Sequence, residues 1–443
     1  MSKRSRQQRL PAPVDQIRIE SLTHDGRGVA HVDGKAVFIE GALPGERVGF
    51  EYLAIHSKFD EGRVLEIHQA SVDRITPRCP HFGVCGGCSL QHMEAGAQIR
   101  AKQQVLVDNL QRIGGVAPES LLPPLTGPVW GYRNKARLGV KHVIKKGRVL
   151  VGFRERHAPY VTDLSRCEVL HPSVGEHIAR LAGMLGELDG RARIPQIEVA
   201  STDAATALVF RHLDPLSESD QARLRSFAGA SRLHVYLQPA GPETVHALEP
   251  ADSVLSYCLP EQNIELRFRP GDFTQVNNVI NCQMAARVLE MLELDSTDTV
   301  LDLYCGLGNF TLPMARLAGS VTGVEGEAGL VERARDNARL NGLDNVAFHI
   351  ADLAADQRHA TWAGGGYSKV LLDPPRSGAA GVLEVLGNIH PRRIVYVSCH
   401  PGSMARDAGT LVSMYGYVLR AAGVMDMFPH TAHVESIALF ESA

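Results

Sequence analysis

The sequence predicts an α/β protein whose C-terminal part is a doubly wound, mostly parallel sheet, preceded by a small β-barrel and a central α+β region. From residue 299 onward, apolar runs typical of buried strands alternate with helical patterns. Residues 12–70 instead hold short alternating strands separated by turn signals, which favours a small antiparallel barrel. Between these two regions lies a cysteine-rich stretch, residues 79–88. Three regions of different architecture therefore follow one another along the chain.

Length and composition predict a multidomain protein of the cytoplasm. With 443 residues, 44% of them hydrophobic, the chain can form roughly two to four domains. It has no run of about 18 apolar residues, so we expect no transmembrane helix. The basic N-terminus, MSKRSRQQRL, lacks the apolar segment of a secretory signal. The eight cysteines do not resemble a disulfide framework, and clustered cysteines in a reducing compartment favour metal binding.

Positive charge is concentrated in two stretches of a chain whose net charge is only −3. Residues 1–10 contain four basic residues and no acidic one. Residues 131–160 contain nine basic residues against Glu155 alone, and nine minus one gives a local charge of +8. The nine are Arg133, Lys135, Arg137, Lys141, Lys145, Lys146, Arg148, Arg154 and Arg156. Such a run is often a solvated face, and Gly147 indicates a hairpin, but two of them favour a polyanionic partner, with nucleic acid the leading candidate.

The barrel region has turn signals at Asp25-Gly26, Asp33-Gly34 and Pro44-Gly45. Five strands are expected, at residues 16–20, 28–32, 36–40, 47–52 and 62–67. Periodicity alone predicts no more than a barrel. This region resembles the TRAM domain, an OB-like RNA-binding barrel. The resemblance is carried by the segments His24-Asp-Gly-Arg-Gly-Val-Ala30 and Gly41-Ala-Leu-Pro-Gly-Glu46.

Four cysteines predict a metal centre in the central region, residues 75–262. Cys79, Cys85 and Cys88 are close in sequence, and two intervening glycines let the backbone fold tightly around an inorganic group. Because the fourth ligand has to come from elsewhere, Cys167, just past the basic stretch, is the candidate. Four thiolates with this uneven spacing favour an iron–sulfur cluster, with zinc second and free thiols far behind. The spacing does not match that of a radical-SAM cluster.

The remaining central residues carry less information. Residues 91–113 have helical periodicity that ends at Gly114-Gly115. Residues 171–262 show a mixed α/β pattern without a catalytic signature. In the C-terminal region, residues 263–443, helices are expected at about 311–317, 328–340 and 403–413. Strands are expected at residues 299–304, 321–325, 346–350, 369–373, 393–398, 417–419 and 435–440.

The ends of the first three of these strands predict the ligand of the sheet. Gly306-Leu-Gly308 leaves room for a bulky ligand, although such a pair is weak evidence alone. Glu325 is placed to accept hydrogen bonds from a ribose diol, and Asp352 suits an adenine amino group. Thr311 stands where a dinucleotide pattern has its last glycine, so a ligand without a pyrophosphate fits better. S-adenosylmethionine is such a ligand, which predicts a Rossmann-like class I SAM-dependent methyltransferase domain.

The ends of the later strands predict the chemistry. Asp373-Pro-Pro-Arg376 has arginine where amino-nitrogen methylases carry an aromatic residue, so amino-group methylation is disfavoured. Cys399, alone, reads as an inert buried thiol. Above a methyl-donor site it can instead add to carbon 6 of uracil and activate carbon 5. We expect the N-terminus of the following helix to lower the pKa of Cys399. Glu435, otherwise a surface acid of an edge strand, is then the candidate base that removes the carbon-5 hydrogen.

These residues carry a resemblance to the RNA uracil-C5 methyltransferase family, and within it to the branch that acts on 23S ribosomal RNA at a uracil-1939-type site. The resemblance covers nearly the whole chain. Its motifs are Cys79/Cys85/Cys88/Cys167, Phe273-Thr-Gln-Val-Asn277, Asp302-Leu-Tyr-Cys-Gly-Leu-Gly-Asn-Phe310, Leu372-Asp-Pro-Pro-Arg376, Ser398-Cys399 and His433-Val-Glu435.

The resemblance implies a role for each candidate residue. Cys399 is the nucleophile, Glu435 is the base, and the four early cysteines hold a [4Fe-4S] cluster. The S-adenosylmethionine site is lined by Gln275, Tyr304, Asn309, Glu325, Asp352 and Asp373. The helix within residues 91–122 is expected to pack on the methyltransferase domain. We expect a monomer that binds ribosomal RNA, with neither DNA nor a membrane as partner.

Three alternatives to this function differ in substrate or class. A transfer-RNA enzyme of the same chemistry is disfavoured because that branch usually lacks both barrel and cluster. A cytosine-C5 methylase would use a cysteine beside the fourth strand's proline, and residues 373–376 contain none. A non-catalytic iron–sulfur RNA-binding protein is the alternative from a different class.

Overall fold

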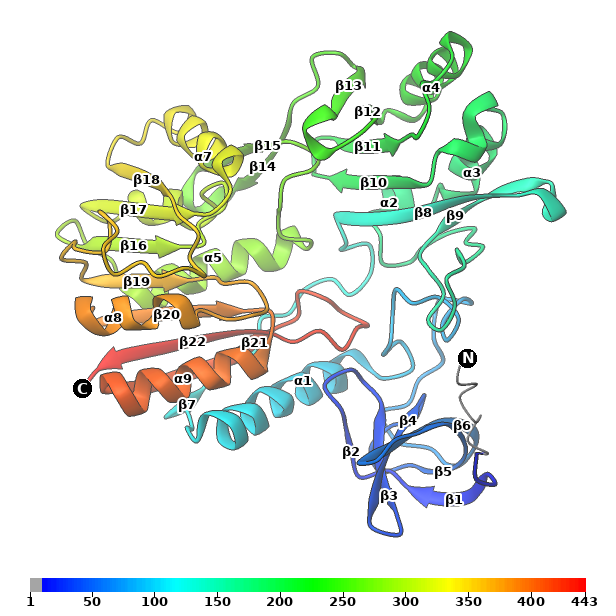
Figure 1. Ribbon diagram of the computed structural model, residues 1–443, viewed down its shortest axis with the longest axis horizontal. Coiled ribbons are helices and arrows are strands. Elements are labelled where there is room, and N and C mark those ends of the chain that lie inside the picture. Colours follow the sequence, from blue (N-terminus) through cyan, green and yellow to red (C-terminus); the bar gives the residue numbers. More distant parts are fainter. Residues whose placement is uncertain (1–9) are drawn as a thin grey trace, which may run out of the picture.

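The computed structural model describes residues 10–443, which form three sheet-based units and one separate hairpin (Figure 1). The basic residues predicted at 1–10, from Lys3 to Arg9, lie outside the described residues. Among the helices of the described chain, none has the length and apolar character needed to cross a bilayer.

The first unit is a six-stranded barrel-like sheet in the order β1-β5-β6-β4-β3-β2. All five predicted strands are confirmed, and the two-residue β2 is added. Their bounds are β1 Val14–Arg18, β2 Ser21–Leu22, β3 Gly28–Val32, β4 Lys35–Glu40, β5 Arg47–Ile55 and β6 Phe59–Gln69. Asp33 and Gly34, both at positive φ, make the tight turn between β3 and β4. Alternate residues such as Val37, Ile39 and Phe50 fill a separate small core.

The second unit is a six-stranded sheet in the order β13-β12-β11-β10-β8-β9. Its strands are β8 Lys135–Val143, β9 Arg148–Gly152, β10 Gln196–Ser201, β11 Thr206–Arg211, β12 His234–Gln238 and β13 His246–Glu249. Its helices are α2 Pro172–Gly175, α3 Ile178–Gly186 and α4 Glu218–Ser231. The basic run at 131–160 thus includes the predicted hairpin, β8 to β9, with Gly147 at φ 63° in its turn. A two-stranded hairpin, β14 Leu255–Leu259 and β15 Ile264–Phe268, leads into the third unit.

The third unit is an eight-stranded sheet in the order β18-β17-β16-β19-β20-β22-β21-β7. Its strands are β7 Ser120–Leu121, β16 Thr299–Leu303, β17 Ser320–Glu325, β18 Val346–Ile350, β19 Lys369–Leu372, β20 Arg393–Ser398, β21 Tyr417–Met425 and β22 Glu435–Ser442. Its helices are α5 Asn278–Leu292, α6 Thr311–Ala315, α7 Ala328–Leu340, α8 Leu383–Ile389 and α9 Pro401–Tyr415. Strands β16 to β20 are mutually parallel, and β22 runs antiparallel to both β20 and β21.

Two features of this sheet place the site. After β16 the chain adds β17 and β18 on one side, and after β19 it adds β20 on the other side. A crevice therefore opens between β16 and β19 at the carboxyl ends of the strands. The last strand, β22, inserts between β20 and β21, which rules out the alternative in which Glu435 is a surface acid of an edge strand. Glu435 therefore begins an internal strand.

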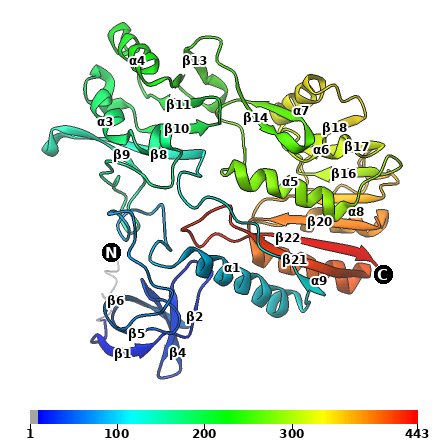
Figure 2. The same cartoon turned by 180° about the vertical axis from the view of Figure 1, so that it is seen from behind.

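An early segment of the chain completes the third unit (Figure 1, Figure 2). Helix α1, Ala95–Asn109, continues as a π-helical turn, Leu110–Gly114, and both pack along α9. Strand β7 then pairs with β21 at the sheet edge. The end of the α1 segment and helix α9 approach closely where two glycines, Gly114 and Gly409, face each other. A Cβ added to Gly409 would lie 2.6 Å from the Gly114 carbonyl oxygen.

Candidate active site

Cys399 and Glu435 come together at the carboxyl edge of the sheet. Ser398 is paired with Ser436 in the antiparallel register of β20 and β22. The next position along both strands is Cys399 opposite Glu435, so β pairing alone brings the thiol and the carboxyl to the same place. Helix α9 follows at once, with Pro401 in its first turn and the His400 ring accepting a hydrogen bond from the Ser403 N–H at 3.1 Å.

The loop after β19 faces the same pair. Asp373 directly follows β19, and Arg376 lies 3.3 Å from the His433 ring. This loop is held to α9 by the buried Asp407 carboxylate, which accepts hydrogen bonds from the Ala379 N–H at 2.7 Å and the Tyr396 hydroxyl at 2.8 Å. The sheet thus supplies a thiol, two carboxyls and a guanidinium from three neighbouring strand ends.

Burial raises the pKa values of Glu435, Asp373 and Cys399 and so favours their protonated forms. Burial, and then the Asp373 carboxylate, raise the pKa of Glu435 to about 8, against the opposing charges of Lys102 and Arg376. Burial raises the pKa of Asp373 to about 7. Burial, followed by Glu435 and Asp373, raises the pKa of Cys399 to about 11. The predicted lowering of the Cys399 pKa is therefore not observed, because burial and two carboxylates raise this pKa and outweigh Arg376.

The first two strands of the sheet form the predicted cofactor edge. Tyr304, Gly306 and Gly308 follow β16 with positive φ, which opens the turn over which a ligand can lie. The Glu325 carboxylate, at the end of β17, accepts hydrogen bonds from the backbone N–H groups of Gly306 at 3.1 Å, Gly326 at 2.7 Å and Glu327. A carboxylate has about four acceptor positions, so capacity remains for a ribose hydroxyl.

The other predicted cofactor residues surround this turn. Asn309 exchanges two hydrogen bonds of 2.9 Å with Asn281 of α5 and accepts a third from the Tyr257 hydroxyl. Gln275 is half-buried in the loop before α5. Asp352 is exposed after β18, where its carboxylate accepts from the Ala354 N–H at 3.0 Å. Five of the six predicted residues, all except Gln275, thus lie at the carboxyl ends of β16 to β19 or in the loops that follow them, while Asn281 and Tyr257 were not predicted.

Asp302 is a further buried acid that the sequence patterns did not single out. One of its oxygens is bonded to the Thr311 hydroxyl, and the other is buried without a partner. Burial, with Asp373 and Glu325 adding repulsion, raises its pKa to about 8. A cationic ligand at this edge would relieve the repulsion among the three acids, which suits the sulfonium of a methyl donor.

Residues 426–434, here called the strap, connect β21 to β22 and reach the cysteine-bearing segment. The His430 carbonyl accepts the N–H groups of Ser89 and Leu90, both at 2.9 Å, and the His430 N–H donates to Gln98 Oε1 at 2.8 Å. The His430 ring stacks on Trp130, with centroids 3.9 Å apart. Glu435 is the residue immediately after the strap, so its position depends on these contacts with residues 89–90, with α1 and with Trp130.

A cleft of about 1430 Å³ lies beside the site and is lined by all three units. Cys399, His433 and Phe428 belong to its wall on the side of the third unit. Six arginines line the cleft against three acidic residues, Asp25, Asp108 and Glu155. These arginines are Arg112, Arg133, Arg137, Arg154, Arg156 and Arg376. The cleft is therefore a basic groove with a nucleophile candidate in its wall, which is suitable for a nucleic acid.

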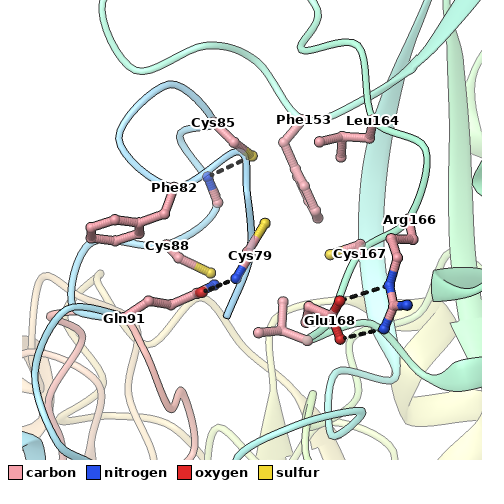
Figure 3. A pocket seen from close by; sticks show the side chains of 12 residues that line it. Cys79, Phe82, Cys85, Cys88, Gln91, Phe153, Leu164, Arg166, Cys167 and Glu168 are labelled. Atoms are coloured by element: carbon pink, nitrogen blue, oxygen red, sulfur yellow. Dashed lines mark hydrogen bonds and ion pairs between the residues drawn. The ribbon is translucent and has the colours of Figure 1, made fainter. Parts of the chain in front are cut away.

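The four predicted cysteines line one small pocket between the cysteine-bearing segment and the central sheet (Figure 3). All four are free thiols. Burial raises the pKa of Cys88 to about 12 and that of Cys167 to about 11, and the other cysteines add to both shifts. Cys85 Sγ accepts the Gly87 N–H at 3.4 Å. Within residues 10–443, no three side chains of the His, Cys, Asp and Glu type converge on a point where one metal ion would bind.

The fold and this edge define the class of the protein. The domain is a Rossmann-like methyltransferase domain. Its parallel strand order reverses between β16 and β19, an acid lies at the end of β17, and the antiparallel strands β22 and β21 lie beyond β20. The barrel that precedes this domain in the sequence is of a kind that suits an enzyme acting on RNA.

Comparison with known proteins gives the family. The family model described as tRNA (Uracil-5-)-methyltransferase matches residues 187–443, and the TRAM domain model matches residues 14–51. A 23S rRNA (uracil(1939)-C(5))-methyltransferase RlmD of Xanthomonas campestris pv. campestris (strain 8004) is 55% identical, covering 96% of this chain and 97% of that protein. A protein of the same name from Alkalilimnicola ehrlichii is 54% identical, covering 98% of each. The chain therefore belongs to the RNA uracil-C5 methyltransferase family and is an S-adenosylmethionine-dependent enzyme, as its motifs predicted.

One solved structure shares the complete architecture. It is the Pyrococcus abyssi tRNA (uracil-54, C5)-methyltransferase in complex with S-adenosyl-L-homocysteine, with a TM-score of 0.73 and 23% identity, covering 96% of this chain and 100% of that one. The similarity shows the fold alone.

Proposed function

We propose that this chain methylates carbon 5 of one uracil in 23S ribosomal RNA, a uracil-1939-type site, with Cys399 as nucleophile and Glu435 as base. The observation that carries the chemistry is the Cys399–Glu435 juxtaposition across β20 and β22, in the wall of the arginine-lined cleft. The substrate rests on full-length relatives of 54–55% identity that bear this name.

The reaction balances with these two groups and the methyl donor. The Cys399 thiolate adds to carbon 6, and the electrons of the carbon 5–carbon 6 double bond move to carbon 5. Carbon 5 then takes the methyl group, whose bond electrons stay with the donor sulfur. The Glu435 carboxylate removes the carbon-5 hydrogen as a proton, the double bond re-forms and the bond from carbon 6 to sulfur breaks. A base with a pKa of about 8 is well suited to this step at neutral pH.

The proposed donor site consists of Gln275, Tyr304, Asn309, Glu325, Asp352 and Asp373. When bound, S-adenosylmethionine supplies the methyl group as a sulfonium. The residues fit it because Glu325 retains acceptor capacity and the buried acids Asp302 and Asp373 favour a cation. Glu325 would hold the ribose, and Asp352 the adenine amino group.

The cleft supports extrusion of the target base. Carbon 6 of a uracil stacked within a helix is out of reach of a thiol in a cleft wall, so the nucleotide has to rotate out of its stack. The arginines would hold the phosphates on either side, and the barrel would bind RNA by shape and backbone. Binding of this kind weakens steeply as salt is raised.

The cysteine pocket fits a [4Fe-4S] cluster held by Cys79, Cys85, Cys88 and Cys167. Burial raises the pKa values of Cys85, Cys88 and Cys167, so these groups are costly as thiolates unless iron neutralises them. A cubane cluster binds each cysteine to a different iron, so its ligands stand farther apart than those of a single zinc ion. The support for a shared group is that all four cysteines line one pocket. The cluster is proposed as a structural group, since it lies beside the segment that holds the strap.

The proposed division of the chain is a barrel over residues 12–70, a central iron–sulfur region over 75–262 and the catalytic domain over 263–443. The helix within 91–122 belongs to the catalytic domain by its packing on α9 and β21. The enzyme would act as a monomer in the cytoplasm, where ribosomal RNA is modified.

The test of the substrate is a methylation map. RNA from a strain lacking the gene is compared with RNA from the parent, with 23S and transfer RNA digested separately and 5-methyluridine located by mass spectrometry. Loss of one 5-methyluridine from 23S RNA, restored by the purified protein with S-adenosylmethionine, is expected. Loss from transfer RNA alone would assign the second candidate substrate, and no loss from either would overturn the proposal.

A further inference from the structure

Lys102 is a buried cation that α1 inserts beneath the active site. Its side chain is 2% exposed, and its ammonium lies 2.7 Å from Asp426 Oδ1. The same ammonium donates to the Phe428 carbonyl oxygen at 2.9 Å. Asp426 and Phe428 are the first and third residues of the strap. Lys102 lies outside residues 187–443, which match the methyltransferase family model. It nevertheless fixes the start of the strap that leads to Glu435.

The partners of Lys102 explain how a lysine can be buried at this position. Burying an ammonium is expensive unless it is paired and hydrogen-bonded. Lys102 meets both conditions, through the Asp426 carboxylate and one strap carbonyl. Gln98, one turn earlier in α1, binds His430 further along the strap. Helix α1 thus holds the strap at two points, one of them charged.

The charge of Lys102 also lowers the pKa of the proposed base, Glu435. The groups that act on Glu435 come from each element around it: Asp373 and Arg376 follow β19, Cys399 follows β20, and Lys102 belongs to α1. Asp426, after β21, is neutralised by Lys102. Burial and Asp373 oppose ionisation of Glu435, whereas Lys102 and Arg376 favour it. Of these two cations, Lys102 is the buried one, and solvent screens it less.

We propose that Lys102 is a positioning residue for the base of the methylation reaction: it anchors the strap in front of Glu435 and keeps the Glu435 carboxylate available to remove the carbon-5 proton. The inference rests on the proposed function, since it assigns a partner to the proposed base. It predicts that loss of Lys102 slows proton removal and leaves the earlier attack of Cys399 on carbon 6 intact.

Two RNA substrates separate these steps. RNA carrying tritium at carbon 5 of uridine releases it to water only when the base removes it. RNA carrying 5-fluorouridine has no removable hydrogen, so it traps the methylated covalent adduct without any action of the base. The experiment measures both rates between pH 6 and pH 9 for the full-length protein and for Lys102→Met.

The expected result is a shift of the acidic limb of tritium release. Without the Lys102 charge the pKa of Glu435 rises, so less of it is ionised at a given pH. A rise of one unit lowers the rate about tenfold on the acidic side. Adduct formation with 5-fluorouridine RNA stays within about threefold of the unaltered protein.

Lys369→Met is the matched control. Lys369 is also buried in an ion pair, 2.6 Å from Asp298, but at the amino end of β19, opposite to the site. It should lower thermal stability as Lys102→Met does, without moving the pH profile. If Lys102→Met does not fold, the Lys102→Met/Asp426→Asn pair removes both charges and avoids an unpaired buried carboxylate.

Three outcomes decide the matter. A shifted release profile in the Lys102 variants, with the adduct retained and Lys369→Met unshifted, supports the inference. An unshifted profile, or parallel loss of release and adduct, overturns it, because Lys102 would then be without effect or merely structural. Failure of the unaltered protein to form any adduct would instead overturn the proposed function itself.

Discussion

Cys399 and Glu435 occupy facing positions one step beyond the last pair of β20 and β22, Ser398 with Ser436. The two groups titrate together for this reason: Glu435 contributes to the rise in the Cys399 pKa, second only to burial. The reactivity of the Cys399 thiol therefore depends on which charges are present beside it.

Replacement of Glu435 by glutamine should make Cys399 more reactive in the free protein. Burial raises the pKa of Cys399 to about 11, and the Glu435 carboxylate, which ionises at a pKa of about 8, adds to this rise. Its removal lowers the Cys399 pKa, so alkylation by iodoacetamide at pH 9, followed by mass spectrometry of the Cys399 peptide, should speed up severalfold. In both proteins the rate should rise with pH.

The exposed Cys258 is the internal control for this labelling. It is remote from Glu435 in the fold, on β14, and its labelling rate should be the same in both proteins. Slower labelling of Cys399 in Glu435→Gln would contradict the charge coupling described here.

The same Glu435→Gln variant should stall turnover after methyl transfer. With unmodified RNA it should accumulate a covalent complex that survives denaturation and carries a labelled methyl group. Removal of a general base typically costs about 10²–10⁴-fold in rate. Electrophoresis of the protein with radiolabelled S-adenosylmethionine measures the complex. Release of free methylated RNA at an unchanged rate would exclude Glu435 as the base.

Gly409→Ala should destabilise the protein by about 1–3 kcal/mol, because its Cβ would lie 2.6 Å from the Gly114 carbonyl oxygen, a backbone atom that cannot move aside cheaply. Chemical denaturation measures the change. Gly229→Ala in α4 is the matched control, since nothing lies within 4 Å of its added Cβ. It should be neutral or stabilising by up to about 1 kcal/mol. Equal effects of the two would show that the α1–α9 crossing is loose.

Cys88→Ser should remove the proposed cluster. Protein purified without oxygen is expected to be brown and to contain iron, and this variant should lose both the visible absorbance and the iron. Cys282→Ser, in α5 and outside the cysteine pocket, should retain them. A colourless unaltered protein that contains zinc would refute the iron–sulfur assignment.

The sequence predicted the elements of the fold well because their patterns are local. All five barrel strands and the alternation of strands and helices after residue 299 are confirmed. The bounds of β16 to β20 lie within about one residue of those predicted, because these strands are apolar runs. The internal place of β22 could not be read in this way, since it depends on pairing between residues about forty apart.

The candidate site was predicted residue by residue, but its electrostatics was not. The motif positions of Cys399, Asp373 and Glu435 converge as expected. The raised pKa of Cys399 was missed, because burial depends on packing that no local pattern reports. Lys102 was missed for a related reason: in sequence it is one cation in a helix, and only the fold places it beside Asp426, 324 positions later. A buried lysine position inside an apolar helical face was the available signal.

The most direct test of the mechanism is covalent trapping by 5-fluorouridine RNA in the presence of S-adenosylmethionine, followed by denaturing electrophoresis and mass spectrometry. The unaltered protein and Cys282→Ala should form an adduct through the peptide that contains Cys399. Cys399→Ala should form none, while it still binds the RNA. An adduct of undiminished yield in Cys399→Ala, or an adduct mapped to another cysteine, would contradict the assignment of Cys399 as the nucleophile.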